Sequence, residues 1–226
     1  MSSRSGAPPA KPCEAEELRS LCGPTLRPGG LALTREALEL GRFPPGARLL
    51  DLGCGPGGTL RLLRESGYEA QGLDKSPEFL AEAGLYGPVL EADFHDLPLD
   101  DEFFDGVFCE CVLSLSPDPA RVLGECARVL KRGGLLVVSD LFSRQSGGRP
   151  GPEPGTLAFF RAQLAAAGFS PRQSLDRSRC LKELAARLVW RSGSAEILAR
   201  LRGPAGARPG PGTSYYLLIA EKTGEA

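Results

Sequence analysis

The 226-residue chain has a formal net charge of −1, a pI near 6.0, 42% hydrophobic residues and 24% charged residues. These values are typical of a globular protein that is long enough to bury its own core, and they predict a single domain. The charge balance argues against a nucleic-acid partner, and no apolar run reaches the ~18 residues that a membrane span needs. The amino terminus lacks the apolar segment of a secretory signal, so we expect a cytoplasmic protein.

The seven cysteines are odd in number, and no export signal accompanies them. We therefore expect no disulfide framework. Cys109 and Cys111 are two positions apart on a predicted strand, which places both side chains on one face. A metal or redox pair is one interpretation of this spacing. Simple burial is favoured, and no metal site is expected, because neither a second pair nor a histidine cluster completes a tetrahedral site.

A tail and one or two helices precede the first predicted strand. Residues 1–14 are rich in Ser, Pro, Ala and Gly, so we expect a flexible tail followed by one folded domain over residues 15–226. A short helix is predicted over residues 14–22. A second helix is predicted over residues 31–40, and Gly41 ends it.

The segment that organises the chain is a strand that breaks into a glycine-rich turn. An apolar strand is predicted over residues 48–53, and the turn contains Gly53, Gly55 and Gly58 before a helix that begins near Thr59. This order is typical of the first unit of a nucleotide-binding α/β sheet. Glycine lets the backbone approach a ligand closely, and the helix presents its unpaired N–H groups to that ligand.

Two ligands are compatible with this turn. The spacing fits the dinucleotide pattern G-x-G-x-x-G, and Asp74 follows at the distance of an acid that binds ribose hydroxyls. Asp51, however, lies in the strand two residues before Gly53, where its carboxylate would repel a pyrophosphate. A carboxylate at this position favours a ligand with positive charge and no phosphate. S-adenosylmethionine, which carries a sulfonium, an ammonium and one carboxylate, is such a ligand.

The run Asp51-Leu-Gly-Cys-Gly-Pro-Gly57 resembles motif I of the class I S-adenosylmethionine-dependent methyltransferases. Residues 97–108 and the phrase Val129-Leu-Lys-Arg-Gly-Gly-Leu135 are similar to later signatures of the same family. The details are bacterial in character and nearest to the broad type 11 group, whose members act on many small molecules. The resemblance implies an α/β, Rossmann-like, seven-stranded and mostly parallel sheet with a reversed last strand and helices on both faces.

The remaining elements agree with this fold. Beyond the first unit, strands are predicted at 68–74, 88–93, 106–112, 135–142, 170–176 and 214–222, and helices at 77–83, 117–130, 156–168 and 179–202. The cofactor-binding core spans residues 48–142. Residues 178–212 form a helical insertion before the last strand, and either substrate specificity or extra packing explains it equally well.

The resemblance also implies roles for single residues. Asp74 accepts hydrogen bonds from two ribose hydroxyls, and Asp93 accepts a hydrogen bond from the adenine amino group. Phe94 lends its backbone N–H to the adenine ring and packs on its face. At the exit of the fourth strand, backbone carbonyls hold the methionine ammonium. The predicted cofactor-binding residues are Asp51, Gly53, Cys54, Gly55, Gly57, Asp74, Lys75, Asp93, Phe94 and Cys109.

The catalytic residues are harder to predict, because methyl transfer depends chiefly on positioning the acceptor. If a general base is needed, the candidates are Glu110, whose pKa burial would raise, and His95, which is the only histidine. Arg27 and the turn at Gly29 and Gly30 have two interpretations. They either face the substrate or form an ordinary helix start.

The sequence therefore predicts a methyltransferase that moves a methyl group from S-adenosylmethionine to a small-molecule acceptor by in-line displacement. An accessory or scaffold protein that binds S-adenosylmethionine without turnover is one alternative. An NAD-dependent oxidoreductase is another, although it would not use Asp51 or Asp93. No motif of amino-methylating or cytosine-methylating nucleic-acid enzymes follows the fourth strand. A metalloid acceptor at Cys54, Cys109 and Cys111 stays open, as do the acceptor atom and the oligomeric state.

Overall fold

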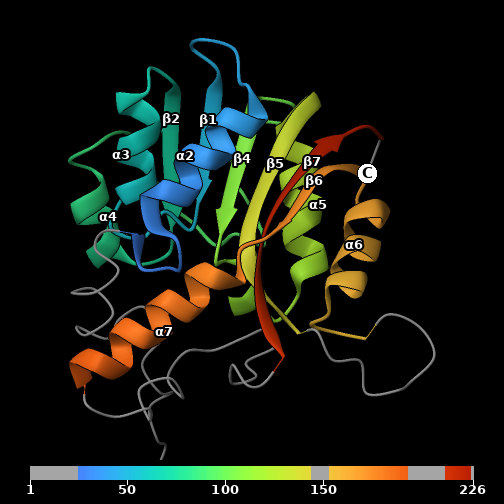
Figure 1. Ribbon diagram of the computed structural model, residues 1–226. Coiled ribbons are helices and arrows are strands. Elements are labelled where there is room, and N and C mark those ends of the chain that lie inside the picture. Colours follow the sequence, from blue (N-terminus) through green and yellow to red (C-terminus); the bar gives the residue numbers. More distant parts are fainter. Residues whose placement is uncertain (1–24, 144–152, 193–211, 225–226) are drawn as a thin grey trace, which may run out of the picture.

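The computed structural model describes residues 25–143, 153–192 and 212–224. The predicted tail over residues 1–14, the predicted helix over residues 14–22 and most of the later part of the insertion lie outside the described residues. Within these ranges the chain forms one seven-stranded sheet with helices packed on both of its faces (Figure 1).

The sheet has the order β3-β2-β1-β4-β5-β7-β6. Six strands are parallel, and β7 runs antiparallel to both β5 and β6. The strands are β1 (Arg48–Leu52), β2 (Glu69–Asp74), β3 (Val89–Glu91), β4 (Phe104–Glu110), β5 (Leu130–Ser143), β6 (Phe169–Asp176) and β7 (Thr213–Lys222). This topology confirms the predicted fold class, including the reversed last strand.

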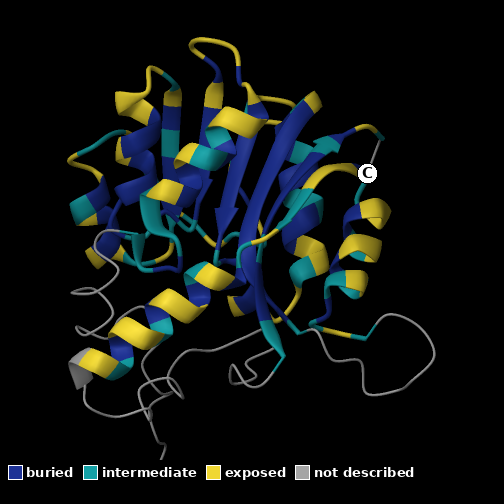
Figure 2. Ribbon diagram, in the orientation of Figure 1, coloured by how far each residue is buried: buried dark blue, intermediate teal, exposed yellow. Residues whose placement is uncertain are grey.

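Two apolar layers flank the sheet. The helices are α2 (Gly30–Gly41), α3 (Gly58–Glu65), α4 (Pro77–Ala83), α5 (Pro119–Val129), α6 (Leu157–Ala166) and α7 (Ser178–Ser192), with a short 3₁₀ turn, η3 (Leu113–Leu115). Buried side chains of α2, α3, α4 and α7 pack on one face, and those of α5 and α6 pack on the other. Figure 2 shows the strands buried between these layers and the outward faces of the helices exposed.

The helix starts follow from local chemistry. Ser76 caps α4 by accepting the N–H of Phe79 at 3.4 Å, and Pro77 occupies the first helical position. Asp118 caps α5 in the same way, by accepting the N–H of Arg121 at 3.2 Å. In both helices a side-chain cap is followed directly by proline, a combination that starts a helix.

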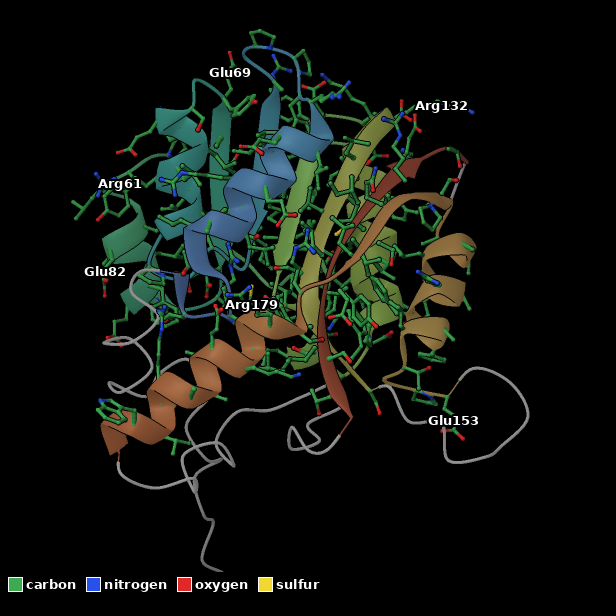
Figure 3. The ribbon with its side chains drawn as sticks, viewed as in Figure 1. Arg61, Glu69, Glu82, Arg132, Glu153 and Arg179 are labelled. Carbon is green, nitrogen blue, oxygen red and sulfur yellow. The ribbon has the colours of Figure 1, made fainter. Side chains whose placement is uncertain are left out.

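The carboxyl ends of the parallel strands meet at one edge of the sheet, toward which the β4 arrow points, and α7 lies across this edge (Figure 1). Arg177 ties the start of α7 to α2, because its Nε atom donates to Glu36 at 2.9 Å. In Figure 3, the labelled Arg179 of α7 lies at this edge and Glu69 at the opposite edge, where β2 begins. Ligands of open α/β sheets bind at the carboxyl edge, so we expect the functional site at this edge.

Several predicted details were wrong. Cys109 and Cys111 do not share a face, because β4 ends at Glu110 and Cys111 adopts a left-handed conformation with φ of 58°. Cys109 packs with the α5 and α6 layer, whereas Cys111 packs with the opposite layer. The third strand is shorter than predicted, so Asp93 lies in the turn beyond it, and the fifth strand starts earlier, at Leu130.

Candidate cofactor and acceptor site

The glycine turn after β1 has a conformation that favours glycine. Gly53, Gly55 and Gly57 have φ angles of 70°, 52° and 91°. A Cβ atom on Gly57 would lie 2.7 Å from the Cα atom of Ala83 in α4, and one on Gly53 would lie 2.6 Å from a methyl group of Val112. A Cβ atom on Gly55 would meet nothing within 4 Å. Two glycines therefore allow close packing, and the third borders open space.

A cleft of about 120 Å³ opens beside this turn at the carboxyl edge of the sheet. Six of the predicted cofactor residues line it: Gly53, Cys54, Gly55, Asp74, Lys75 and Phe94. Glu110 also lines it. The structure thus brings together residues from the ends of β1, β2 and β4 and from the turn after β3.

Asp74 joins the glycine turn to α4. Its Oδ2 atom accepts the N–H of Gly55 at 2.9 Å, and its Oδ1 atom accepts the N–H of Ser76 at 2.9 Å. An ionised carboxylate has about four acceptor positions, so these two bonds leave capacity for ligand hydroxyls. Asp74 is therefore held in place at the mouth of the cleft before any ligand arrives.

Four predicted residues do not line the cleft. Gly57 packs against α4, and the Cys109 side chain is fully buried in the core, where burial raises the pKa of its thiol well above the ordinary value. Asp93 is exposed in the turn beyond β3. Asp51 is 3% exposed and lies behind the glycine turn.

A buried ion pair closes the inner side of the site. The Nη2 atom of Arg27 donates to the Oε2 atom of Glu110 at 2.7 Å, and the two side chains are 2% and 3% exposed. The hydroxyl of Thr59 donates to the same carboxylate oxygen at 2.9 Å, and Arg27 also donates to Thr34. Arg27 is thus a buried partner of Glu110, a relationship that neither interpretation of the sequence included.

Two buried atoms near this ion pair have no hydrogen-bond partner within the described residues: Nη1 of Arg27 and Oδ2 of Asp51. Burial, and secondarily the nearby Glu110, raises the pKa of Asp51 to about 8. Buried polar atoms without partners need an explanation. An amino-acid group, which carries an ammonium and a carboxylate, offers charges complementary to both.

His95 is held in one orientation by two neighbours. Its Nδ1 atom lies 2.5 Å from Oδ1 of Asp93, and its Nε2 atom lies 2.8 Å from Oγ of Ser116. The backbone N–H of His95 donates to the same Asp93 oxygen, and this bond is the largest of the interactions that lower the pKa of Asp93. Because an ionised carboxylate only accepts, Nδ1 donates to Asp93, and in the neutral ring Nε2 is then the acceptor for the Ser116 hydroxyl. No sequence motif had indicated Ser116.

A second cavity of about 270 Å³ lies between the amino-terminal ends of α5 and α6. We call it the α5–α6 cavity. Its lining includes Leu113, Ser116, Asp140, Phe142, Phe159 and Phe160. The segment 112–116 borders both spaces, because Val112 and Leu115 line the cleft whereas Leu113 and Ser116 line the cavity.

The described ranges 25–143, 153–192 and 212–224 hold no group of three or more His, Cys, Asp or Glu side chains that would bind a metal ion. They also hold no helix that is long and apolar enough to cross a membrane.

Comparison with known proteins identifies the domain. The family model described as a methyltransferase domain matches residues 50–138, from β1 into β5. The uncharacterized methyltransferase YodH of Bacillus subtilis is 36% identical over 129 residues, which cover 54% of this chain and 55% of that protein. Residues 50–138 form a methyltransferase domain by their match to this family model.

Two further proteins resemble this methyltransferase domain. A ubiquinone biosynthesis O-methyltransferase of Xylella fastidiosa is 35% identical over 104 residues, or 42% of each chain. A phosphoethanolamine N-methyltransferase of Haemonchus contortus, solved with phosphomonomethylethanolamine and S-adenosylhomocysteine, has a TM-score of 0.74 at 18% identity and covers 92% of this chain and 56% of its own. The chain spans about half the length of the curated relatives it matches.

S-adenosylmethionine is the cofactor of this methyltransferase domain. The residues of the cleft fit it on physical grounds. Asp74 has acceptor capacity for a ribose, and Phe94 offers an aromatic face. The unpartnered atoms of Asp51 and Arg27 are buried and do not line the cleft.

Proposed function

We propose that the chain transfers a methyl group from S-adenosylmethionine to a small-molecule acceptor. The observation that supports this most directly is the cleft beside the glycine turn, where Asp74 is already fixed by Gly55 and Ser76. The fold and the family match agree with this function.

Roles in cofactor binding follow from the contacts. Asp74 accepts hydrogen bonds from the ribose. Asp93 is ionised at neutral pH, because bonds from His95 lower its pKa, and it is therefore an acceptor for the adenine amino group. Phe94 packs on the adenine, and Lys75, whose Nζ atom lies 5.6 Å from the Phe94 ring centroid, borders the same space.

Cys54 and Cys109 contribute to cofactor binding through their backbone atoms rather than through their side chains. Burial raises the pKa values of Cys54 and Cys109 above the ordinary thiol range, so both side chains are neutral. A neutral buried thiol is a poor metal ligand or nucleophile. The backbone of Cys54 belongs to the glycine turn, and the carbonyl of Cys109 lies near the end of β4, where the methionine group is expected.

When bound, S-adenosylmethionine supplies a methyl group that its sulfonium already activates. The protein then needs to orient the acceptor, exclude water and, for an acceptor with a proton, remove that proton. Glu110 as a general base stays a prediction, and its bonds to Arg27 and Thr59 favour a positioning role. His95 has the better-defined orientation, because Asp93 fixes its protonated nitrogen.

Calorimetric titration with S-adenosylhomocysteine tests cofactor binding, with NAD(H) as the comparison ligand. Asp74→Ala should abolish or greatly weaken binding, and Asp100→Ala, which removes an exposed acid outside the cleft, should leave it unchanged. Preferential binding of NAD(H) would contradict the proposal. Transfer of label from S-adenosylmethionine to acceptor compounds then distinguishes an enzyme from an accessory protein that only binds.

A further inference from the structure

The α5–α6 cavity has mostly apolar walls with aromatic rings. Phe142 and Phe160 are buried and lie 5.1 Å apart between ring centroids, and Phe159 is half-buried at the same wall. Its volume of about 270 Å³ is close to the ~300 Å³ at which small-molecule pockets begin. Flat, apolar compounds are the molecules that such walls bind best.

Two buried polar side chains in this cavity have different roles. Asp140 is 1% exposed, and its two oxygens accept the N–H groups of Ser114 at 2.9 Å and Leu141 at 2.7 Å. It therefore fixes the backbone around the exit of β4. Ser116 is 3% exposed, and its Oγ atom accepts the N–H of Asp118 at 3.0 Å and lies 2.8 Å from Nε2 of His95.

The hydroxyl of Ser116 has acceptor capacity left. A serine hydroxyl has one donor and two acceptor positions, and the N–H of Asp118 occupies one of the acceptors. When the His95 ring is neutral and Nδ1 donates to Asp93, the Ser116 hydroxyl donates to Nε2. In that state the hydrogen bonds are oriented to carry a proton away from the cavity, toward the exposed carboxylate of Asp93.

The cavity lies next to the cofactor cleft. Neighbouring residues of the segment 112–116 line the two spaces, and the N–H of Cys111, which borders the cleft, donates at 2.7 Å to the carbonyl of Ser139, the residue before Asp140. The ring of Phe94, which lines the cleft, lies 4.6 Å from the ring of His95. An acceptor in the cavity would thus be adjacent to the bound cofactor.

Building on the proposed methyl transfer, we propose that the α5–α6 cavity binds the acceptor, an apolar ring compound with a hydroxyl group. We assign Ser116 and His95 as the path that takes up its proton. Methylation of the hydroxyl forms an O–C bond and breaks the C–S bond, whose electron pair stays on sulfur. The hydroxyl proton passes to Ser116, the Ser116 proton passes to Nε2 of His95, and Asp93 stabilises the resulting imidazolium.

A binding experiment with 2-naphthol and naphthalene tests the site. Ser116→Ala should weaken binding of 2-naphthol about three- to tenfold, the effect of one lost hydrogen bond, and leave naphthalene unchanged. Phe159→Ala should weaken both probes, because it removes part of the shared apolar wall. Ser170→Ala, an exposed serine on β6, is the matched control and should change neither.

Turnover tests the proton path. Wild-type protein with S-adenosylmethionine should convert 2-naphthol to 2-methoxynaphthalene, and His95→Gln should lower kcat while changing KM little. Activity of this variant should recover at a pH at which 2-naphthol ionises in solution, a rescue that a purely structural role of His95 would not produce. Absence of rescue would overturn the assigned path.

Binding of S-adenosylhomocysteine separates the two proposals. If the wild-type protein fails to bind it, the proposed cofactor function has failed. If it binds, but 2-naphthol and a series of larger apolar phenols neither bind in a Ser116-dependent manner nor become methylated, the acceptor assignment is wrong although the cofactor function stands.

Discussion

Arg27 and Glu110 form a buried ion pair of 2.7 Å between residues that are 83 positions apart in the chain. Arg27 precedes α2, and Glu110 is the last residue of β4, so the pair fixes the loop before α2 against the carboxyl edge of the sheet. The cleft borders both segments. Its shape therefore depends on this single contact.

Breaking this pair should be costly. Arg27→Met leaves the Glu110 carboxylate buried without its partner, and we expect the free energy of unfolding to fall by ~3–5 kcal/mol. Urea denaturation of both single variants and of the Arg27→Met/Glu110→Leu double variant measures the coupling. The double variant should be more stable than the sum of the single losses predicts, and strictly additive losses would contradict a direct interaction.

The raised pKa of Asp51 should make stability depend on pH. Its folded pKa of about 8 lies above the ordinary value of 3.8, so the folded state holds the proton more tightly. The contribution of Asp51 is therefore fully present below about pH 4 and is lost as the pH rises toward 8. Asp51→Asn should unfold with a flatter pH dependence and be more stable than wild type at pH 8. Equal slopes in the two proteins would contradict a buried, protonated Asp51.

Cofactor binding should release a proton at pH 7. Asp51 is largely protonated there in the free protein, because its pKa is about 8, and an ammonium placed nearby would favour the ionised form. Titration with S-adenosylhomocysteine in buffers of different ionisation enthalpy measures this release. Asp51→Asn should bind without it, and release that persists in Asp51→Asn would point to a different titrating group.

The packing of the glycine turn is testable with two glycines of similar conformation. Gly57 and Gly67 have φ angles of 91° and 87°, but only Gly57 would bring a Cβ atom against Ala83, at 2.7 Å. Gly67→Ala should cost ~1–2 kcal/mol from backbone strain alone. Gly57→Ala should cost more and should also weaken binding of S-adenosylhomocysteine, because α4 must move. Equal losses of stability would mean that the turn and α4 adjust freely.

Local patterns in the sequence predicted most of the sheet. The positions of most strands and of Asp74 at the end of β2 depend on residues close in the chain, so they are readable from spacing. The resemblance to the methyltransferase family implied a reversed last strand, and β7 is antiparallel to its neighbours.

Contacts between distant segments were not predictable in the same way. The partner of Glu110 lies before α2, and the partner of His95 lies beyond β4, so both depend on how the helices and loops pack. Cys111 adopts a left-handed conformation, so the alternation of side chains along β4 does not extend to it. The expectation that Cys109 and Cys111 share a face was therefore wrong. No local sequence pattern predicts these two partners or the conformation of Cys111, because tertiary packing determines them.

The segment 112–116 contributes side chains to both the cleft and the α5–α6 cavity. Val112 and Leu115 line the cleft, and Leu113 and Ser116 line the cavity. A point substitution in this segment can therefore change the lining of one space while the other keeps its own. Insertion or deletion of a single residue would shift the segment and place different side chains in the cleft and in the cavity, so we expect its length to vary less among homologues than its composition.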